Sequence, residues 1–484
     1  MAPLLVVTVV NIVSVPLFYR FLGPEMYALW FYVLTFTGAF GFMDLGLGVA
    51  VGRYIGVALG KGDLDAVREY WGTGNAIAIP LLAAMAVGFA IVGVIFGPKW
   101  FNASPTHVDL LRWSFVAGGA GLFLSYYCQF WLILSQAHLD FRFLAIVRTA
   151  FSVLQVVPSI PLAWMTRSPL VLIFWATVVA ALQLAVLVWH GRSSYRLGFS
   201  VRHAERKRGR EMAVYTGKTF VSLVMNSLLA SVDRLVLGRL APPVDFARYV
   251  IAANVGSRIL GLGGAVMGPV FSNTNRAAGS GKDASLAVVY NEAFDFTLPW
   301  YTLISVWAWL WHPVFLRIWL GENLGASVAP LFSPIIIACC FTAIANISTA
   351  QLASINRVGI TLFFGLSTCV FLVVGVSLGW RWHGVAGVAW AFLLSRAIPF
   401  AQDLFLIRLV KADGWLALRT WKHIILQAAL GLGLFSTVLF TPRTSLWHLI
   451  PALTHAGVVG GWLVRHAVRN IIAGWTAKPA SQFV

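Results

Sequence analysis

The sequence predicts an all-α integral membrane protein with about 14 transmembrane helices, and three observations support this fold class. Of the 484 residues, 59% are hydrophobic. Only 11% are charged, whereas an ordinary soluble domain has about 25% charged residues. Apolar runs of about 20 residues, long enough to cross a hydrocarbon core of about 30 Å, recur along the whole chain. A soluble fold is therefore excluded, and the function must reside in the helix bundle or in its short connections.

Glycine, proline and charged residues interrupt the apolar runs and give the expected boundaries of the helices. We expect helices at residues 2–20, 27–58, 70–97, 109–135, 143–166, 168–190, 213–238, 247–275, 286–312, 330–355, 357–379, 383–411, 420–440 and 446–468. The first run lacks a basic start and a small-residue cleavage site, so we do not interpret it as a signal peptide.

The distribution of Lys and Arg predicts the orientation of these helices. Connections after even-numbered helices carry 21 of the 35 Lys and Arg residues, and connections after odd-numbered helices carry nine. Because cytoplasmic loops carry the excess of positive charge, both termini are expected in the cytoplasm. In a membrane chain, the net charge of +18 reflects this topology and anionic lipid, so nucleic acid is not an expected partner.

The longest polar connection predicts the domain boundaries. Residues 191–212 follow the sixth helix and contain the basic run RKRGR at 206–210. We expect a six-helix lobe at 1–190, this basic cytoplasmic linker, a second six-helix lobe at 213–411, and two accessory helices with a short cytoplasmic tail at 412–484. The basic run is either a solvated loop that fixes topology or a site for anionic lipid or a partner.

A weak internal repeat relates the two lobes. In the first lobe, FLGPEMYALW (21–30) precedes a long helix that closes on GKGD (60–63). In the second lobe, LAPPVDFARY (240–249) precedes a long helix that closes on GSGKD (279–283). Two pseudo-symmetric lobes with a substrate site between them at mid-membrane are typical of secondary transporters, which work by alternating access.

The same segments carry a family resemblance. The run RFLGPEMYALWFYVLTFTGAFGFMDLGLGVAVGRYIGVALGKGD (20–63) resembles the start of the polysaccharide-biosynthesis flippases, and DRLVLGRLAPPVDFARYVIAANV (233–255) is similar to their matching stretch. The resemblance implies membership of the superfamily that also holds lipid II flippases and multidrug and toxin extrusion antiporters. Its motifs are shared by transporters of different cargo.

The resemblance implies a cargo and a location. The expected substrate is an undecaprenyl-diphosphate-linked oligosaccharide, of the O-antigen, lipopolysaccharide or exopolysaccharide type, flipped from the cytoplasmic to the outer leaflet of the bacterial inner membrane. Membrane lipids, a coupling proton or sodium ion, and polysaccharide polymerase machinery are the other expected partners.

Two other functions are weighed against this one. A cation-coupled multidrug antiporter, or a lipid II type flippase, is the alternative within the superfamily. Members of the antiporter branch commonly carry a carboxylate in the first span, where this sequence has Asn11 and Ser14. The segment EMAVYTGKTF (211–220), with Lys218, has no counterpart before Met1, so we expect the native protein to begin about ten residues upstream. An integral-membrane glycan enzyme is disfavoured, because the odd-side connections are short and hold no carboxylate pair.

Two deep arginines are the candidate substrate-binding residues. Arg258 and Arg396 lie near the middle of expected helices. Leaving an arginine in lipid at mid-span costs about 2.5 to 3.5 kcal/mol, so both are expected to line a polar cavity. A guanidinium group suits a diphosphate, because its planar fork makes paired hydrogen bonds to phosphate oxygens. The alternative is an internal ion pair with Asp403, two turns after Arg396 on the same helical face.

The remaining candidates are polar groups within spans and a stripe of glycines. Asp44, Arg53 and Asp403 are candidate coupling or cavity residues. A stripe that recurs every four residues is expected either to pack statically or to slide during alternating access; it consists of Gly48, Gly52, Gly56 and Gly60.

No cofactor or metal is expected. The four cysteines fall in apolar spans without a spacing that could bring four ligands to a metal ion, so we interpret them as small core residues; they are Cys128, Cys339, Cys340 and Cys369.

The charge count yields a topology test. Because residues 206–210 are expected in the cytoplasm and residues 97–107 outside, an impermeant thiol reagent should label a cysteine at position 102 in intact cells and leave one at position 208 unlabelled. The measurement is mass-tagging of the two single-cysteine variants before and after cell lysis. The reverse pattern of labelling would overturn the assigned orientation.

Overall fold

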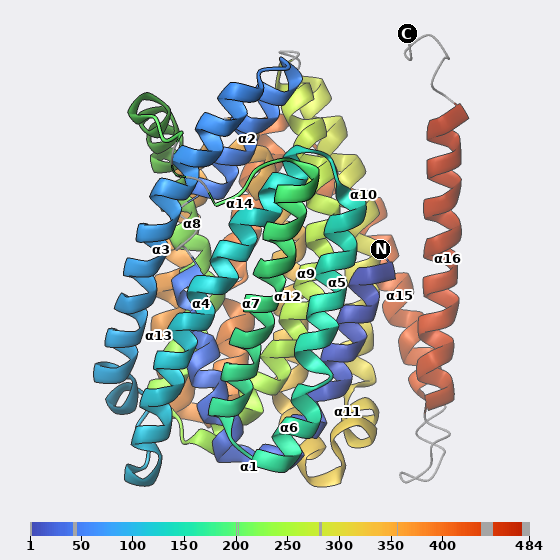
Figure 1. Ribbon diagram of the computed structural model, residues 1–484. Helices are drawn as coiled ribbons and strands as arrows, with labels where there is room; N and C mark the ends of the chain where they lie inside the picture. The colour runs from blue at the N-terminus through green and yellow to red at the C-terminus, as the bar shows by residue number, and fades with distance from the viewer. Residues whose placement is uncertain are drawn as a thin grey trace. The chain divides into compact units, whose positions relative to one another are not determined.

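The computed structural model describes residues 2–41, 46–199, 201, 203–279, 283–355, 357–436 and 449–476. Over these residues the regular secondary structure is helical (Figure 1). The chain forms two compact units, Met1–Ala247 and Arg248–Val484. Among the described residues, six helices are long and apolar enough to cross a membrane, or up to seven if one pair bent by 73° is a single span. The all-helical membrane class is thus confirmed, whereas the count of 14 stays a prediction.

The first unit is a bundle in which α4 takes a central place. Its helices are α1 (Ala2–Ala39), α2 (Leu47–Gly60), α3 (Leu64–Trp100), α4 (Val108–Ala137), α5 (Phe141–Val156), α6 (Ser159–Thr166), α7 (Pro169–Ser194) and α8 (Arg206–Leu240), with the short turn η2 (Pro105–His107). Helix α4 packs against α1, α2, α3, α5 and α7. Glycines allow the close approach of α3 and α4, because the Phe115 ring lies where side chains at Gly93 and Gly97 would stand. The expected helix at 143–166 is divided into α5 and α6 beside Pro158.

The break expected between helices 2–20 and 27–58 is present in the structure, and the second of these helices is itself divided. The segment α1 consists of two helices that meet at a kink at Gly23, where the backbone is non-helical with a φ of 76° just before Pro24, so the expected boundary at 21–26 is confirmed. The expected second helix ends in the structure at Ala39, and α2 starts anew after Gly46, whose φ is 72°. Glycine adopts positive φ at little cost, so these two positions set the breaks.

The expected linker at 191–212 is shorter in the structure, because helix extends into it from both sides. Helix α7 continues to Ser194 and α8 begins at Arg206, so the basic run 206–210 forms the first turns of a helix rather than a loop. This expectation of a basic loop was wrong for a local reason. Lys and Arg are good helix formers, and polarity alone does not distinguish an exposed helix end from a loop.

Helix α8 is fastened to the first unit at both ends. At its start, the Glu205 backbone N–H donates to Thr73 Oγ1 at 2.9 Å. At its other end, the Trp100 indole donates to the carbonyl of Leu235 at 3.0 Å. Asn102 and Arg239 are joined there by two further hydrogen bonds. These contacts explain why the first compact unit extends to Ala247, whereas the expected lobe boundary at 191–212 stays a prediction.

In the second unit, α10 and α12 contact most of the other helices. The unit contains most of α9 (Pro243–Gly279), followed by α10 (Asp283–Leu310), α11 (His312–Leu320), α12 (Glu322–Ser354), α13 (Val358–Leu394), α14 (Ala397–Val410), η3 (Gly414–Leu416), α15 (Leu418–Ser436) and α16 (Leu449–Thr476). Helix α12 packs against α10, α11, α13 and α14, and both α15 and α16 pack against α10. The apolar stretch of α12 is 72% buried, more than that of any other span in the described part of the chain.

The break expected between helices 357–379 and 383–411 is present in the structure, and the second of these helices is divided once more. The segment α13 consists of two helices that meet at a kink with non-helical backbone at His383 and Gly384, within a few residues of the expected boundary. A further break, which the apolar run did not predict, lies between Leu394 and Ala397. The backbone at 395–396 therefore leaves the helix beside Arg396, within a stretch that sequence analysis treated as continuous.

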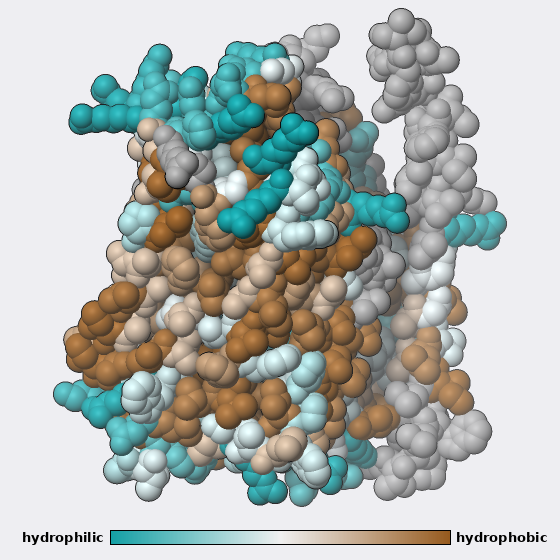
Figure 2. All heavy atoms as spheres, in the orientation of Figure 1, coloured by the Kyte–Doolittle hydropathy of each residue, from teal (hydrophilic) through white to brown (hydrophobic). Residues whose placement is uncertain are grey.

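The surface of the first unit fits a lipid environment. On the face shown in Figure 2, hydrophobic side chains predominate over the middle of α3, α4, α5 and α7, and hydrophilic side chains gather at the ends of these helices. Exposed large apolar residues are frequent on the same helices, including Ile95, Phe96, Trp113 and Phe174. This pattern is that of a membrane protein, whose apolar side chains meet lipid tails.

The glycine stripe of α2 differs along its length. Gly48 is buried, and a Cβ atom at Gly52 would lie 2.5 Å from Ile133 Cγ2 of α4. At Gly56 and Gly60, a Cβ atom would meet nothing within 4 Å. Of Gly52, Gly56 and Gly60, it is therefore Gly52 that lies in a close contact between α2 and α4.

The difference between Gly52 and Gly56 can be measured. Gly52→Ala should lower the free energy of unfolding by about 1 to 3 kcal/mol, because the new methyl group overpacks the contact with Ile133. Gly56→Ala should be neutral or stabilise by about 0.5 to 1 kcal/mol, because alanine favours helix. Thermal unfolding of both purified variants makes the comparison, and Ile133→Ala should restore the Gly52→Ala variant. Equal effects of the two substitutions would contradict the assigned contact.

Candidate functional site

Arg396 lies at the break between α13 and α14 and is 8% exposed. Its guanidinium Nε donates to the carbonyl of Phe392 at 3.3 Å and to Ser395 Oγ at 3.0 Å. One terminal nitrogen donates to Thr342 Oγ1 of α12 at 3.0 Å. The guanidinium also lies over the Phe392 ring, 4.5 Å from its centroid. A cation at the C-terminal end of a helix is favourable, so these contacts stabilise the break and join α13 to α12.

Arg258, the other candidate arginine, lies on α9 and is partly buried. Around it, α9 is held closely by its neighbours. A Cβ atom at Gly256 would lie 2.7 Å from Cys339 Sγ of α12. The Tyr301 hydroxyl of α10 donates to the carbonyl of Ile259 at 3.3 Å. The backbone that carries Arg258 is thus fixed against α10 and α12.

Asp403 is the centre of a buried polar cluster in the second unit, with 1% of its surface exposed. Its Oδ1 accepts a hydrogen bond from the Tyr290 hydroxyl of α10 at 2.9 Å and another from the Ser348 hydroxyl of α12. Its Oδ2 accepts from the Trp415 indole in η3 at 2.5 Å. Three donors from three elements surround the carboxylate, so Asp403 ties α10, α12 and η3 to α14.

The spacing of Arg396 and Asp403 suggested an ion pair between them, but their hydrogen bonds go to different partners. Arg396 bonds to Phe392, Ser395 and Thr342. Asp403 bonds to a different set, on α10, α12 and η3. Because the helix is broken beside Arg396, the two residues do not lie on one continuous helical face.

The other polar candidates are placed as follows. Arg53 is exposed on α2. Asp44 lies outside the described residues. Its role as a coupling or cavity residue stays a prediction.

A charged cluster that sequence analysis missed fixes the start of α8. Arg208 Nε lies 3.2 Å from Glu69 Oε2 of α3, and a terminal nitrogen of Arg208 donates to the Tyr70 hydroxyl at 2.9 Å. The same Tyr70 hydroxyl donates to Glu211 Oε2 at 2.8 Å. Arg208 belongs to the basic run 206–210. The total charge of that run gave no sign that one of its residues bonds to side chains of α3.

A second cluster fixes the turn between α4 and α5. Asp140 accepts hydrogen bonds from the Phe143 backbone N–H, the Tyr195 hydroxyl and His190 Nε2. Burial alone would raise the pKa of Asp140, but these three hydrogen bonds hold that pKa below its usual range. Burial, together with the hydrogen bond to Asp140, raises the pKa of Tyr195 to about 12. The carboxylate therefore stays ionised and links this turn to the end of α7.

Equivalent positions in the two units contact the chain just after the sixth and the twelfth expected helices. Trp71 lies eight residues after the aspartate of GKGD, and Asn291 lies eight residues after the aspartate of GSGKD. The Trp71 indole donates to the carbonyl of Gly198 at 3.0 Å. Asn291 Oδ1 accepts from the backbone N–H groups of Asp413 and Gly414 at 3.1 and 3.2 Å. This correspondence supports the internal repeat with contacts rather than with spacing alone.

The Arg208 cluster yields a stability prediction. Arg208→Ala should lower the free energy of unfolding by about 1 kcal/mol, because charge-assisted hydrogen bonds to Glu69 and Tyr70 are lost from a partly exposed site. Lys207→Ala, at an exposed neighbouring position, is the matched control and should change it by less than about 0.5 kcal/mol. Thermal unfolding together with limited proteolysis of residues 195–205 is the measurement. The contact would be refuted by an Arg208 variant that resists heat and protease as well as the Lys207 variant does.

Solved structures with the same fold are membrane transporters. The chain resembles an inward-facing multidrug resistance transporter of the MATE family, with a TM-score of 0.67 and 16% identity over 84% of this chain and 95% of that one. It resembles the lipid II flippase MurJ, with a TM-score of 0.66 and 13% identity over 97% and 100% of the two chains. A MOP superfamily transporter from Pyrococcus furiosus matches with a TM-score of 0.64 and 14% identity over 85% and 94%.

The family follows from the sequence itself. No curated protein was found that matches the chain. A family model described as polysaccharide biosynthesis protein matches residues 3–275, which is more than half of the chain. The match includes the whole first repeat and the segment LAPPVDFARY (240–249) of the second, and ends just before GSGKD. The chain therefore belongs to the polysaccharide biosynthesis protein family and has the fold of the MOP superfamily transporters.

Proposed function

We propose that this protein flips a lipid-linked oligosaccharide, carried on undecaprenyl diphosphate, from the cytoplasmic to the outer leaflet of a bacterial inner membrane by alternating access. The observation that carries the proposal is the match of residues 3–275 to the polysaccharide biosynthesis family. The fold alone does not select this cargo, because a multidrug transporter and a lipid II flippase match about equally well. Transport, rather than catalysis, is the activity proposed for the helix bundle.

The polar residues of the first expected span, 2–20, help to distinguish a flippase from a multidrug antiporter. Its polar residues make local contacts, since Asn11 Nδ2 donates to the carbonyl of Val7 at 2.7 Å and Ser14 Oγ donates to that of Asn11 at 2.9 Å. Residues 2–20 contain no Asp or Glu. These observations favour a glycan flippase over an antiporter whose coupling carboxylate lies in that span.

The proposed roles of the two arginines differ. Arg258, partly buried on an anchored segment of α9, is proposed to bind the diphosphate through its planar fork. Arg396 makes three hydrogen bonds at the α13–α14 break, so its contribution to substrate binding is proposed to depend on that break. Asp403 is proposed as the group that holds α14 in place for Arg396, and a proton or sodium ion as the coupling ion.

Substitution of the arginines tests the cargo and the site together. Arg258→Gln should lower export of lipid-linked glycan about 10- to 100-fold, since it removes a charge-assisted contact of about 1.5 to 3 kcal/mol. Arg258→Lys should recover export only in part, because it keeps the charge and loses the fork. Arg112→Gln, at an exposed surface pair with Asp109, is the matched control and should export normally. The measurement is surface glycan in cells that depend on this protein, normalised to the amount of protein in the membrane.

The same assay separates substrate binding from structure at Arg396. Arg396→Gln should lower export while membrane abundance falls little, if the guanidinium serves the substrate. Loss of the protein from the membrane would show instead that the helix break itself requires Arg396. Normal export by both the Arg258 and Arg396 glutamine variants would refute the site.

A further inference from the structure

One stripe of α8 changes from basic to apolar along its length. Arg206, Arg210, Ala213, Gly217 and Phe220 follow one another at intervals of four, three, four and three residues. Residues at this spacing lie on one face of a helix. The two arginines are exposed at the start of α8, and the apolar members follow within about 15 Å along the helix axis. The stripe therefore joins a cationic end to an apolar segment.

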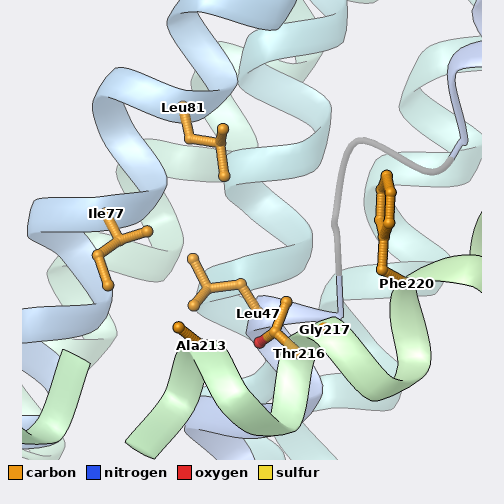
Figure 3. A pocket seen from close by; sticks show the side chains of 7 residues that line it. All are labelled: Leu47, Ile77, Leu81, Ala213, Thr216, Gly217 and Phe220. Atoms are coloured by element: carbon orange, nitrogen blue, oxygen red, sulfur yellow. The ribbon is translucent and has the colours of Figure 1, made fainter. Parts of the chain in front are cut away.

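The apolar part of this stripe lines a pocket. The pocket has a volume of about 300 Å³ and is formed within the first unit by α2, α3 and α8 (Figure 3). Its lining consists of Leu47, Ile77, Leu81, Ala213, Thr216, Gly217 and Phe220. This volume is at the lower end of the range of about 300 to 1,000 Å³ for small-molecule sites, so the pocket suits part of one hydrocarbon chain.

Small residues on α8 create the pocket. At Gly209, a Cβ atom would lie 3.5 Å from Thr73 and 3.8 Å from Ile77, so α8 touches α3 there. Two turns later, a Cβ atom at Gly217 would meet nothing within 4 Å. Ala213, one turn before Gly217, also has a short side chain. The space between α8 and α3 thus opens just beyond the basic end of the helix.

The cations beside the pocket are accessible. Arg206, Lys207 and Arg210 are all exposed, whereas Arg208 between them is turned to Glu69 and Tyr70. Arg208 fixes the first turns of α8, so the exposed cations stand on a rigid support. Cations at the membrane surface attract anionic lipid headgroups, and the arginine fork fits phosphate oxygens. The charge at this end of the pocket is complementary to a lipid phosphate.

We propose that this stripe is a binding site for an anionic phospholipid, with its phosphate between Arg206 and Arg210 and one acyl chain in the pocket beside Gly217. A phospholipid has an anionic phosphate followed by an apolar acyl chain. Along α8, the arginines that complement the phosphate are likewise followed by the apolar pocket that complements the chain. The headgroup remains at the membrane surface and the chain extends inward along the helix. The proposal is independent of the cargo, because it concerns a lipid that stays bound to the first unit.

The test uses the full chain in detergent and measures retained lipid by native mass spectrometry after incubation with phosphatidylglycerol or phosphatidylcholine. The unchanged protein should retain phosphatidylglycerol and should unfold at a higher temperature in its presence, with no such effect of phosphatidylcholine. Gly217→Leu should fill the pocket and lower retention of phosphatidylglycerol about tenfold. The double variant Arg206→Gln with Arg210→Gln should lower it to a similar extent.

Matched controls separate the site from general effects of the substitutions. Gly60→Leu also enters open space, and Lys99→Gln with Arg112→Gln removes two cations elsewhere; both should bind phosphatidylglycerol normally. If Gly217→Leu does not fold, Leu81→Trp fills the pocket from α3. Undiminished retention by the pocket and arginine variants, or equal retention of the two lipids, would overturn the proposal. Displacement of phosphatidylglycerol by equimolar undecaprenyl diphosphate would also overturn it, by assigning the site to the cargo.

Discussion

A charged or hydrogen-bonding group inside a hydrocarbon core needs its partner within the protein, because lipid tails offer none. Two buried charged residues of the second unit, Arg396 and Asp403, have such partners. Arg396 occupies a helix break, where it donates to the carbonyl of Phe392 and to the hydroxyls of Ser395 and Thr342. Asp403 collects three donors from three elements of the same unit. Each charge therefore also fixes the backbone around it.

In the first unit, polar contacts at partly exposed helix ends also fix the backbone. Asp140 holds the α4–α5 turn to the end of α7, and Arg208 holds the start of α8 to α3. At the opposite end of α8, Asn102 and Arg239 make a reciprocal pair of hydrogen bonds. Helix α8, although it follows the linker in sequence, is thus part of the first compact unit.

The sequence predicted the helices well, and it predicted the breaks near Gly23 and near His383 but missed those beside Gly46 and Arg396. Runs of apolar residues depend on composition, so the expected helices at 70–97, 109–135 and 168–190 each match one helix within a few residues. Breaks depend on the local backbone. The restart of the helix after Gly46 was missed because it falls within an apolar run. The break beside Arg396 was missed for the same reason.

The candidate site could be predicted only in part. The depth of Arg258 and Arg396 followed from the length of the apolar runs, and both are partly or fully buried. Their partners did not follow, because Thr342 is far from Arg396 in sequence. The cluster at Asp403 likewise joins residues from α10 and α12 that no local pattern connects. The internal repeat could have suggested one contact. Trp71 and Asn291 lie at equivalent positions of the two repeats, and each bonds to the backbone of a later segment.

The central claim, transport of a lipid-linked oligosaccharide, is tested most directly with purified protein in liposomes. The liposomes carry a fluorescent oligosaccharide on undecaprenyl diphosphate, and a membrane-impermeant quencher reports the fraction in the outer leaflet over time. The account predicts that the protein speeds exchange between leaflets, and that Arg258→Gln slows it while Arg112→Gln does not. Exchange no faster than in protein-free liposomes, together with ion-driven uptake of a cationic drug by the same preparation, would contradict the account.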